Sequence, residues 1–152
     1  MPRNNAFLTG TGLHLAYWHW PQYVEQQTRT TSHPSVDRGL GAMIWPGSGL
    51  DGVTAGSLAH SFPGERQADI WLGLGFAIAF LADLYDVKSK GAMLPNSGPM
   101  GPYLRQGIAF GAFQRSRFQP DDEQLDEICR QTAGEPAAAL VRRSRNTFAK
   151  WE

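Results

Sequence analysis

Two groups of polar side chains lie beside apolar sequence, where they could carry out acid–base chemistry. His14 belongs to an aromatic segment, TGTGLHLAYWHW (residues 9–20), and a half-buried imidazole that titrates near neutrality is suited to moving protons. A hydrogen-bonded core histidine is the structural alternative. Arg66 and Asp69 precede a long apolar run and are three residues apart, so they can pair on one helical face. Such a pair serves either as a charged helix end in water or as the mouth of a pocket, where Asp69 holds Arg66 or a substrate cation.

No spacing in the chain favours a metal or a cofactor. His14 and His19 are five residues apart, which separates them on a helix, and no His-x3-His pattern accompanies them. Asp121-Asp122-x-x-x-Asp126-Glu127 is similar to acidic motifs that bind magnesium in terpene synthases, but acids at a helix N-terminus are stabilising without a ligand. We therefore expect no metal and no cofactor, and we expect Cys129 to be a buried structural thiol.

The element that must position these groups is the segment of residues 62–83, FPGERQADIWLGLGFAIAFLAD. Pro63 and Gly64 can begin a helix. Between Asp69 and Asp83, 13 residues carry no charge, and apolar residues surround the whole circumference. A bilayer span needs about 20 such residues, so we expect a buried central helix and no membrane span.

A small-residue motif recurs along the chain. Gly39-Leu40-Gly41-Ala42, Gly73-Leu74-Gly75-Phe76 and Gly107-Ile108-Ala109-Phe110 begin 34 residues apart, and Gly10-Thr11-Gly12-Leu13 begins 29 residues before the first of them. Periods of this size are typical of stacked helical units that cannot bury their apolar faces alone. Glycine inside a helix is costly, and the simplest compensation is a close approach of neighbouring helices. We therefore predict pseudo-repeats packed inside one globule.

Start and stop signals divide the chain into helices. The predicted helices cover residues 9–20, 36–45 with Ser35 as cap and an end before Pro46, 53–60, 62–83, 102–118, one from 120–123 to a stop at Gly134, and a last one from Pro136. No convincing alternating strand pattern is present. We predict an all-α fold, a single compact helical domain (residues 1–152) of about six to seven helices around the buried central one.

Composition narrows the function classes. Fourteen basic and fourteen acidic residues cancel, and no basic cluster interleaves with aromatic residues, so we expect no nucleic-acid partner. A single cysteine excludes an internal disulfide. The start of the chain, MPRNNAFLTG, has no apolar targeting segment, and we expect a cytoplasmic protein. Five tryptophans and eight phenylalanines suit either a dense core or a cavity for an apolar ligand.

Five blocks of the sequence follow one another in the order and approximate spacing of a known family. They are GTGLHLAYWH (10–19), VDRGLGAMIW (36–45), FPGERQADIWLGLGFAIAF (62–80), YLRQGIAFGAFQR (103–115), and Cys129 followed by Ala137-Ala138-Ala139. Over nearly all of its length the chain resembles the C-terminal portion of the enediyne biosynthesis protein family, found in natural-product gene clusters, whose members also carry a related N-terminal half. The positions that carry over are His14, Asp37, Gly39, Gly41, Trp45, Arg66, Asp69, Trp71, Gly73, Gly75, Gln106, Gly107 and Arg115.

Two functions are consistent with the resemblance and the residues. In the first, a biosynthetic protein encloses an apolar intermediate, such as a polyene or isoprenoid-like chain, and assists its cyclisation or folding without a cofactor. Its acid–base candidates are Asp37, Asp69 and His14, and its substrate contacts are Trp18, Trp45, Arg66, Trp71, Gln106 and Arg115. In the second, the chain is a non-catalytic helical interaction module that forms a homodimer or binds a larger biosynthetic partner. Convergence of the polar residues in space would favour the first function, and scattered positions would favour the second.

Overall fold

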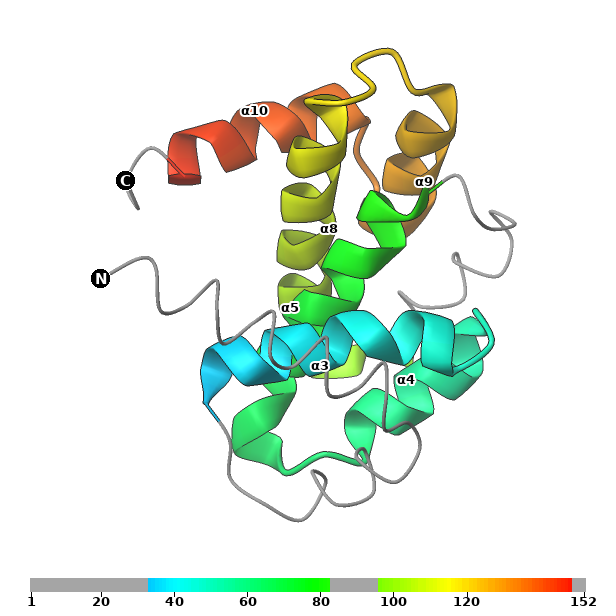
Figure 1. Cartoon of the computed structure of the whole chain (residues 1–152), viewed down its shortest axis with the longest axis vertical. Helices are drawn as coiled ribbons and strands as arrows, with labels where there is room; N and C mark the ends of the chain where they lie inside the picture. The colour runs from blue at the N-terminus through cyan, green and yellow to red at the C-terminus, as the bar shows by residue number, and fades with distance from the viewer. Residues whose placement is uncertain (1–32, 83–95, 149–152) are drawn as a thin grey trace.

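The computed structural model describes residues 33–82 and 96–148, without the side chains of residues 146–148. Throughout these ranges the regular structure is helical (Figure 1). The helices are α3 (Pro34–Gly47), α4 (Gly52–His60), α5 (Gly64–Phe80), the short 3-10 helix η2 (Gly98–Met100), α8 (Gly101–Ser116), α9 (Glu123–Ala133) and α10 (Ala137–Phe148). The predicted all-α class is confirmed, whereas the predicted helix over residues 9–20 lies outside the described residues.

Acidic caps begin α4 and α9, and one glycine ends α9. The carboxylates of Asp51 and Asp122 accept hydrogen bonds from the backbone N–H groups of Thr54 (2.7 Å) and Leu125 (3.1 Å) at the starts of α4 and α9. Gly134 ends α9 in the left-handed region, at φ 76°, where a residue without a Cβ has no steric cost. The predicted stop at Gly134 is therefore confirmed.

The ends of α3 differ from the prediction. Its cap is His33, whose Nδ1 lies 3.2 Å from the backbone nitrogen of Ser35, so Ser35 is already inside the helix. At the other end the helix includes Pro46 and continues to Gly47. Proline disfavours helical geometry at the residue before it, which here is Trp45. Trp45 is completely buried, however, and its packing stabilises the last turn of the helix.

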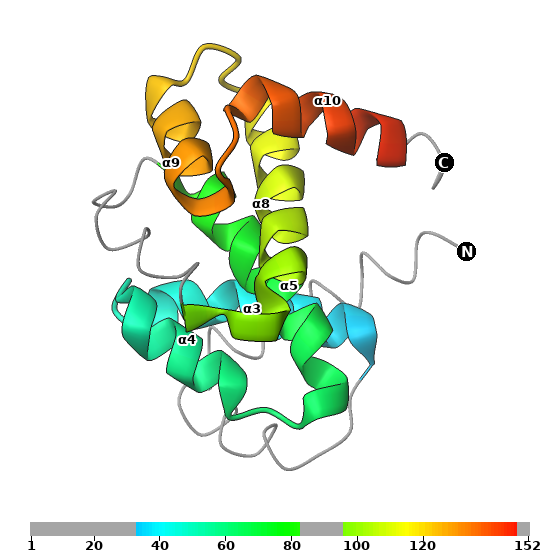
Figure 2. The same ribbon diagram turned by 180° about the vertical axis from the view of Figure 1, so that it is seen from behind.

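Three helices form the centre of the structure. Helix α5 packs against α3 on one side and α8 on the other. Helices α3 and α4 lie at one end of the α5–α8 pair, and α9 and α10 lie at the other end (Figures 1 and 2). Ile70, Leu74 and Ile78 of α5 are fully buried, which confirms the prediction of a buried central helix. None of the described helices has the length and hydrophobicity needed to cross a bilayer.

The glycines of α3 and α5 lie where the two backbones meet. A Cβ atom on Gly41 would overlap the carbonyl oxygen of Ile70, and one on Gly73 would overlap that of Arg38. Each helix thus places a glycine against the backbone of the other. Because backbone atoms cannot swing away as a side chain can, only glycine permits this approach.

The interface between α5 and α8 repeats this arrangement. Here a Cβ on Gly75 would overlap the carbonyl oxygen of Leu104, and one on Gly107 would overlap that of Leu72. Each of these four residues lies 34 positions after its counterpart in the α3–α5 interface. The contacts of these four glycines therefore recur with the predicted period, and all four face neighbouring helices.

Candidate functional site

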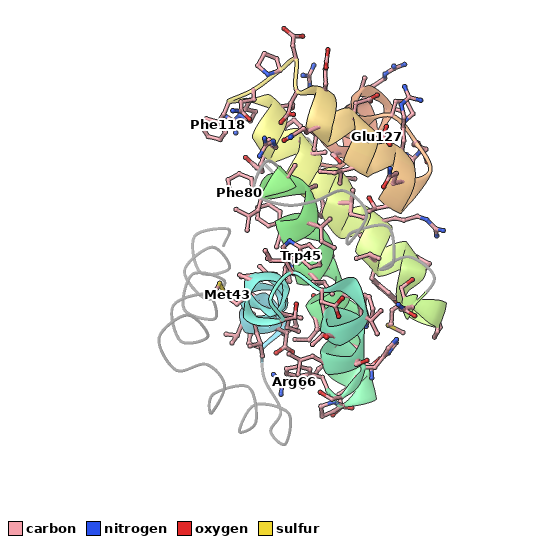
Figure 3. All side chains as sticks on the ribbon, turned by 90° about the vertical axis from the view of Figure 1, so that its right-hand side faces the viewer. Met43, Trp45, Arg66, Phe80, Phe118 and Glu127 are labelled. Atoms are coloured by element: carbon pink, nitrogen blue, oxygen red, sulfur yellow. The ribbon has the colours of Figure 1, made fainter. Side chains whose placement is uncertain are left out.

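A buried ion pair joins α3 to the start of α5. Nη2 of Arg66 donates to Oδ1 of Asp37 at 2.6 Å, and its Nε lies 3.2 Å from both carboxylate oxygens. The two side chains are only 2% and 3% exposed. The guanidinium also lies over the ring of Phe62, 5.3 Å from its centroid, in cation–π geometry. Figure 3 shows Arg66 on α5 close to α3.

A second ion pair lies beside the first and is partly open to solvent. Nε of Arg38 donates to Oδ1 of Asp69 at 2.7 Å, with side chains 34% and 22% exposed. The predicted pairing of Arg66 with Asp69 along α5 is therefore wrong, since both residues pair with α3 instead. A pair within one helix is worth only about 0.2–0.5 kcal/mol, and α3 brings opposite charges against this face of α5.

This cluster of two ion pairs is built to hold two helices together. Asp37 is predicted to act as an acid or base, but its carboxylate is bound by a guanidinium and buried from solvent. Removing either partner of a buried ion pair is strongly destabilising, which favours a structural role for Asp37. Asp37, Arg66 and Asp69 line none of the three pockets that we describe.

The two described tryptophans of the candidate site lie in the core. Trp45 and Trp71 have no exposed surface and belong to the continuous apolar cluster; Trp45 is labelled in Figure 3. The Trp71 ring contacts the imidazole of His60, with centroids 4.9 Å apart. We predicted that both tryptophans contact a substrate, but in the described part they contact protein. Trp18 and His14 lie outside the described residues.

Gln106 and Arg115 lie far apart on α8 and have different surroundings. Gln106 is exposed and lines a groove of about 410 Å³ between α8 and α10, which we call the α8 groove. Arg115 is buried, pairs with Asp122, and donates from Nη1 to the carbonyl oxygen of Phe80 at 3.1 Å. It therefore joins the ends of α5 and α8 to the start of α9.

Two acids of the motif at the start of α9 serve as helix caps. Asp122 caps α9, and Oδ1 of Asp126 accepts a hydrogen bond from the backbone N–H of Ala137 at 2.8 Å, at the start of α10. These acids line an open pocket of about 690 Å³ that also contains Arg142 and Arg145. Over the described ranges, no three metal-ligating side chains come together.

Nine site residues were predicted, and seven of them are described by the structure. Among these seven, the ion-pair cluster contains Asp37, Arg66 and Asp69. The sequence analysis missed Arg38, the partner of Asp69. A signal for it was present: charged residues precede the glycine motif in both α3 and α5, and the repeat predicts that these helices are neighbours. Opposite charges at the same end of two packed helices, such as Arg38 and Asp69, are expected to pair.

The described helices, which pack against one another through glycines, form an all-α domain. The chain belongs to the family described as protein of unknown function (DUF1702), whose model matches residues 5–150. No curated protein and no solved structure matches the chain. The family description names no activity, so the resemblance to enediyne biosynthesis proteins stays a prediction.

Proposed function

We propose that this protein is a non-catalytic helical interaction module that pairs with a second copy of itself through the α8 groove. The observation that supports the proposal is the repeated glycine interface. Each of its helices uses the second small residue of the motif to receive the next helix: Gly41 of α3 receives α5, and Gly75 of α5 receives α8. The equivalent residue of α8 is Ala109, 34 positions after Gly75.

The face of α8 around Ala109 has the features of a further helix-receiving face. Ala109 is 8% exposed, whereas Pro102 and Gln106 on the same side of the helix are exposed. Helix α10 packs on α8 but carries Val141 where the motif would place its next glycine, 34 positions after Gly107. A valine cannot make the same backbone approach, and an open groove remains between the two helices.

Charge also favours self-association. The chain has no formal net charge at pH 7, so copies do not repel one another strongly. The catalytic hypothesis has less support, because the described candidate residues have structural roles. Asp37 and Asp69 are in ion pairs, and Trp45 and Trp71 are packed in the core. A place in natural-product biosynthesis rests on the resemblance alone, and the enclosure of an apolar intermediate rests on the resemblance and the aromatic content.

The test is the oligomeric state of the full chain, measured by light scattering and native mass spectrometry over a range of concentrations. We expect a dimer whose dissociation constant rises at least about tenfold in Gln106→Lys, since a charge would be buried in the interface. Gln131→Lys on the exposed face of α9 is the matched control and should dimerise like the wild type. A monomer at all concentrations, or equal dimerisation of both variants, would refute the proposal. A retained small-molecule mass would instead support the enclosing function.

A further inference from the structure

The α8 groove carries charge of one sign. Its charged lining residues are Arg105 of α8 and Arg143 of α10, and no acidic residue of the described ranges lines it. The open pocket beside α9 differs, because both acids and arginines line it. Since the whole chain has no formal net charge, the positive charge of the groove is a local feature, and it should attract an anion.

Arg105 has no counter-charge within the part of the chain that the structure describes. There it forms neither a hydrogen bond nor an ion pair, whereas Arg143 on the other wall binds Glu135 at 2.5 Å. The Arg105 side chain is also exposed. A guanidinium binds a carboxylate through two parallel hydrogen bonds, so Arg105 is available to bind such a group.

Ser144 supplies a second polar group. It lines the groove from α10 and is only 4% exposed. Its hydroxyl has no hydrogen-bond partner among the described residues. Other hydroxyls of the protein donate to backbone carbonyl oxygens three or four residues earlier, namely those of Ser48, Ser61, Ser116 and Thr132. Because burying a hydroxyl without a partner is unfavourable, a ligand that accepts a hydrogen bond from Ser144 gains affinity.

The remaining surface of the groove is largely apolar. Ala109 and Phe110 line it about one turn after Arg105. The volume of about 410 Å³ lies within the range of small-molecule sites. We infer that the α8 groove binds a carboxylate that carries a short apolar chain. The carboxylate accepts hydrogen bonds from Arg105 and Ser144, and the apolar chain lies on Ala109 and Phe110.

Such a ligand also regulates the proposed self-association. It occupies the face of α8 that we propose to receive a second copy, so the ligand and the second copy exclude each other. This effect rests on the proposed function, whereas the binding of the carboxylate does not.

The first experiment titrates the full-length, isotope-labelled protein with sodium hexanoate and follows the backbone amides by NMR. The amides of Ala109, Phe110 and Ser144 should shift and reach saturation. Acetate should bind at least about tenfold more weakly, because it lacks most of the apolar chain, and hexylammonium should not bind. If hexanoate and acetate bind equally, the groove holds an adventitious ion only and the inference is wrong. Tighter binding of hexylammonium or of inorganic phosphate would overturn the carboxylate assignment.

The second experiment tests the two polar groups. Arg105→Gln should raise the Kd for hexanoate at least about tenfold, and Ser144→Ala should raise it about threefold or more. Ser144→Ala should not lower Tm, because alanine favours the helix and removes the unpartnered hydroxyl. Arg117→Gln, at an exposed position outside the groove, is the matched control and should bind hexanoate like the wild type. Unchanged binding in both groove variants, or an equal loss in the control, would refute the inference.

Light scattering with and without saturating hexanoate separates this inference from the proposed association. A shift from dimer to monomer supports the regulation. A dimer that persists while hexanoate is bound overturns the regulation and leaves the association intact. A monomeric chain that still binds hexanoate in the groove supports the site and refutes the association.

Discussion

Gly73 and Arg38 are in contact through their backbones, with no room for a Cβ atom between them. The same relationship joins Gly107 and Leu72, each 34 positions further along the chain. These contacts explain why glycines interrupt otherwise apolar helices. Their cost in helix propensity, about 1 kcal/mol each, is offset by closer packing of the helices.

Gly73→Ala should destabilise the protein by about 3 kcal/mol, since α3 and α5 must move apart to relieve the overlap and the gain in helix propensity is smaller. Urea unfolding of the two proteins measures the difference. Gly64→Ala, in the first turn of the same helix with nothing near its Cβ, should be neutral or stabilising by up to about 1 kcal/mol. A Gly73→Ala protein within about 0.5 kcal/mol of wild type would show that the interface is not tightly packed.

Much of the fold could be predicted because its signals are local. Proline, the acidic cap before α9 and Gly134 mark helix boundaries through their own backbone preferences. The recurring glycine motif also predicted that helices approach one another closely at these glycines. The end of α3 was missed because burial of Trp45, a tertiary effect, extends the helix through Pro46.

The candidate site was less predictable because it depends on which side chains meet across helices. Arg66 and Asp69 are well spaced to pair with each other, and only the position of α3 decides that they pair elsewhere. Similarly, aromatic content alone does not distinguish a packed core from a cavity wall. Trp45 and Trp71 belong to the core because α3 and α5 approach so closely.

The stabilising effect of Asp126 should depend on pH. Hydrogen bonds from the Arg130 side chain and the Ala137 backbone lower the pKa of Asp126 below its usual value of 3.8. The unfolded state therefore takes up the proton first as pH falls, so the contribution is complete above about pH 5 and is lost as pH falls through the folded-state pKa. The difference in unfolding free energy between wild type and Asp126→Ala should be constant from pH 7 to about 5 and shrink below that. A difference that grows on acidification would contradict this assignment.

Cys129 should be unreactive in the folded protein. Burial, together with the nearby carboxylates of Asp126 and Asp122, raises its pKa from 9.0 to about 12. At pH 8 the thiolate is then roughly a thousand times scarcer than in the unfolded chain, and burial also blocks access. Labelling with a disulfide reagent should thus be at least that much slower before than after denaturation in guanidinium. Rapid labelling of the native protein would mean that α9 opens readily.

The last prediction separates a structural from a catalytic role for Asp37. Asp37→Asn should cost about 3–5 kcal/mol, because it breaks the buried ion pair through which Arg66 joins α5 to α3. Asp69→Asn is the matched control, and its loss should be only about 0–1 kcal/mol because that pair is partly exposed. Replacing both partners of the buried pair, in Asp37→Leu with Arg66→Met, should recover most of the stability. If Asp37→Asn were no more destabilising than Asp69→Asn, the buried pair would not be holding α3 to α5, and an acid–base role for Asp37 would regain support.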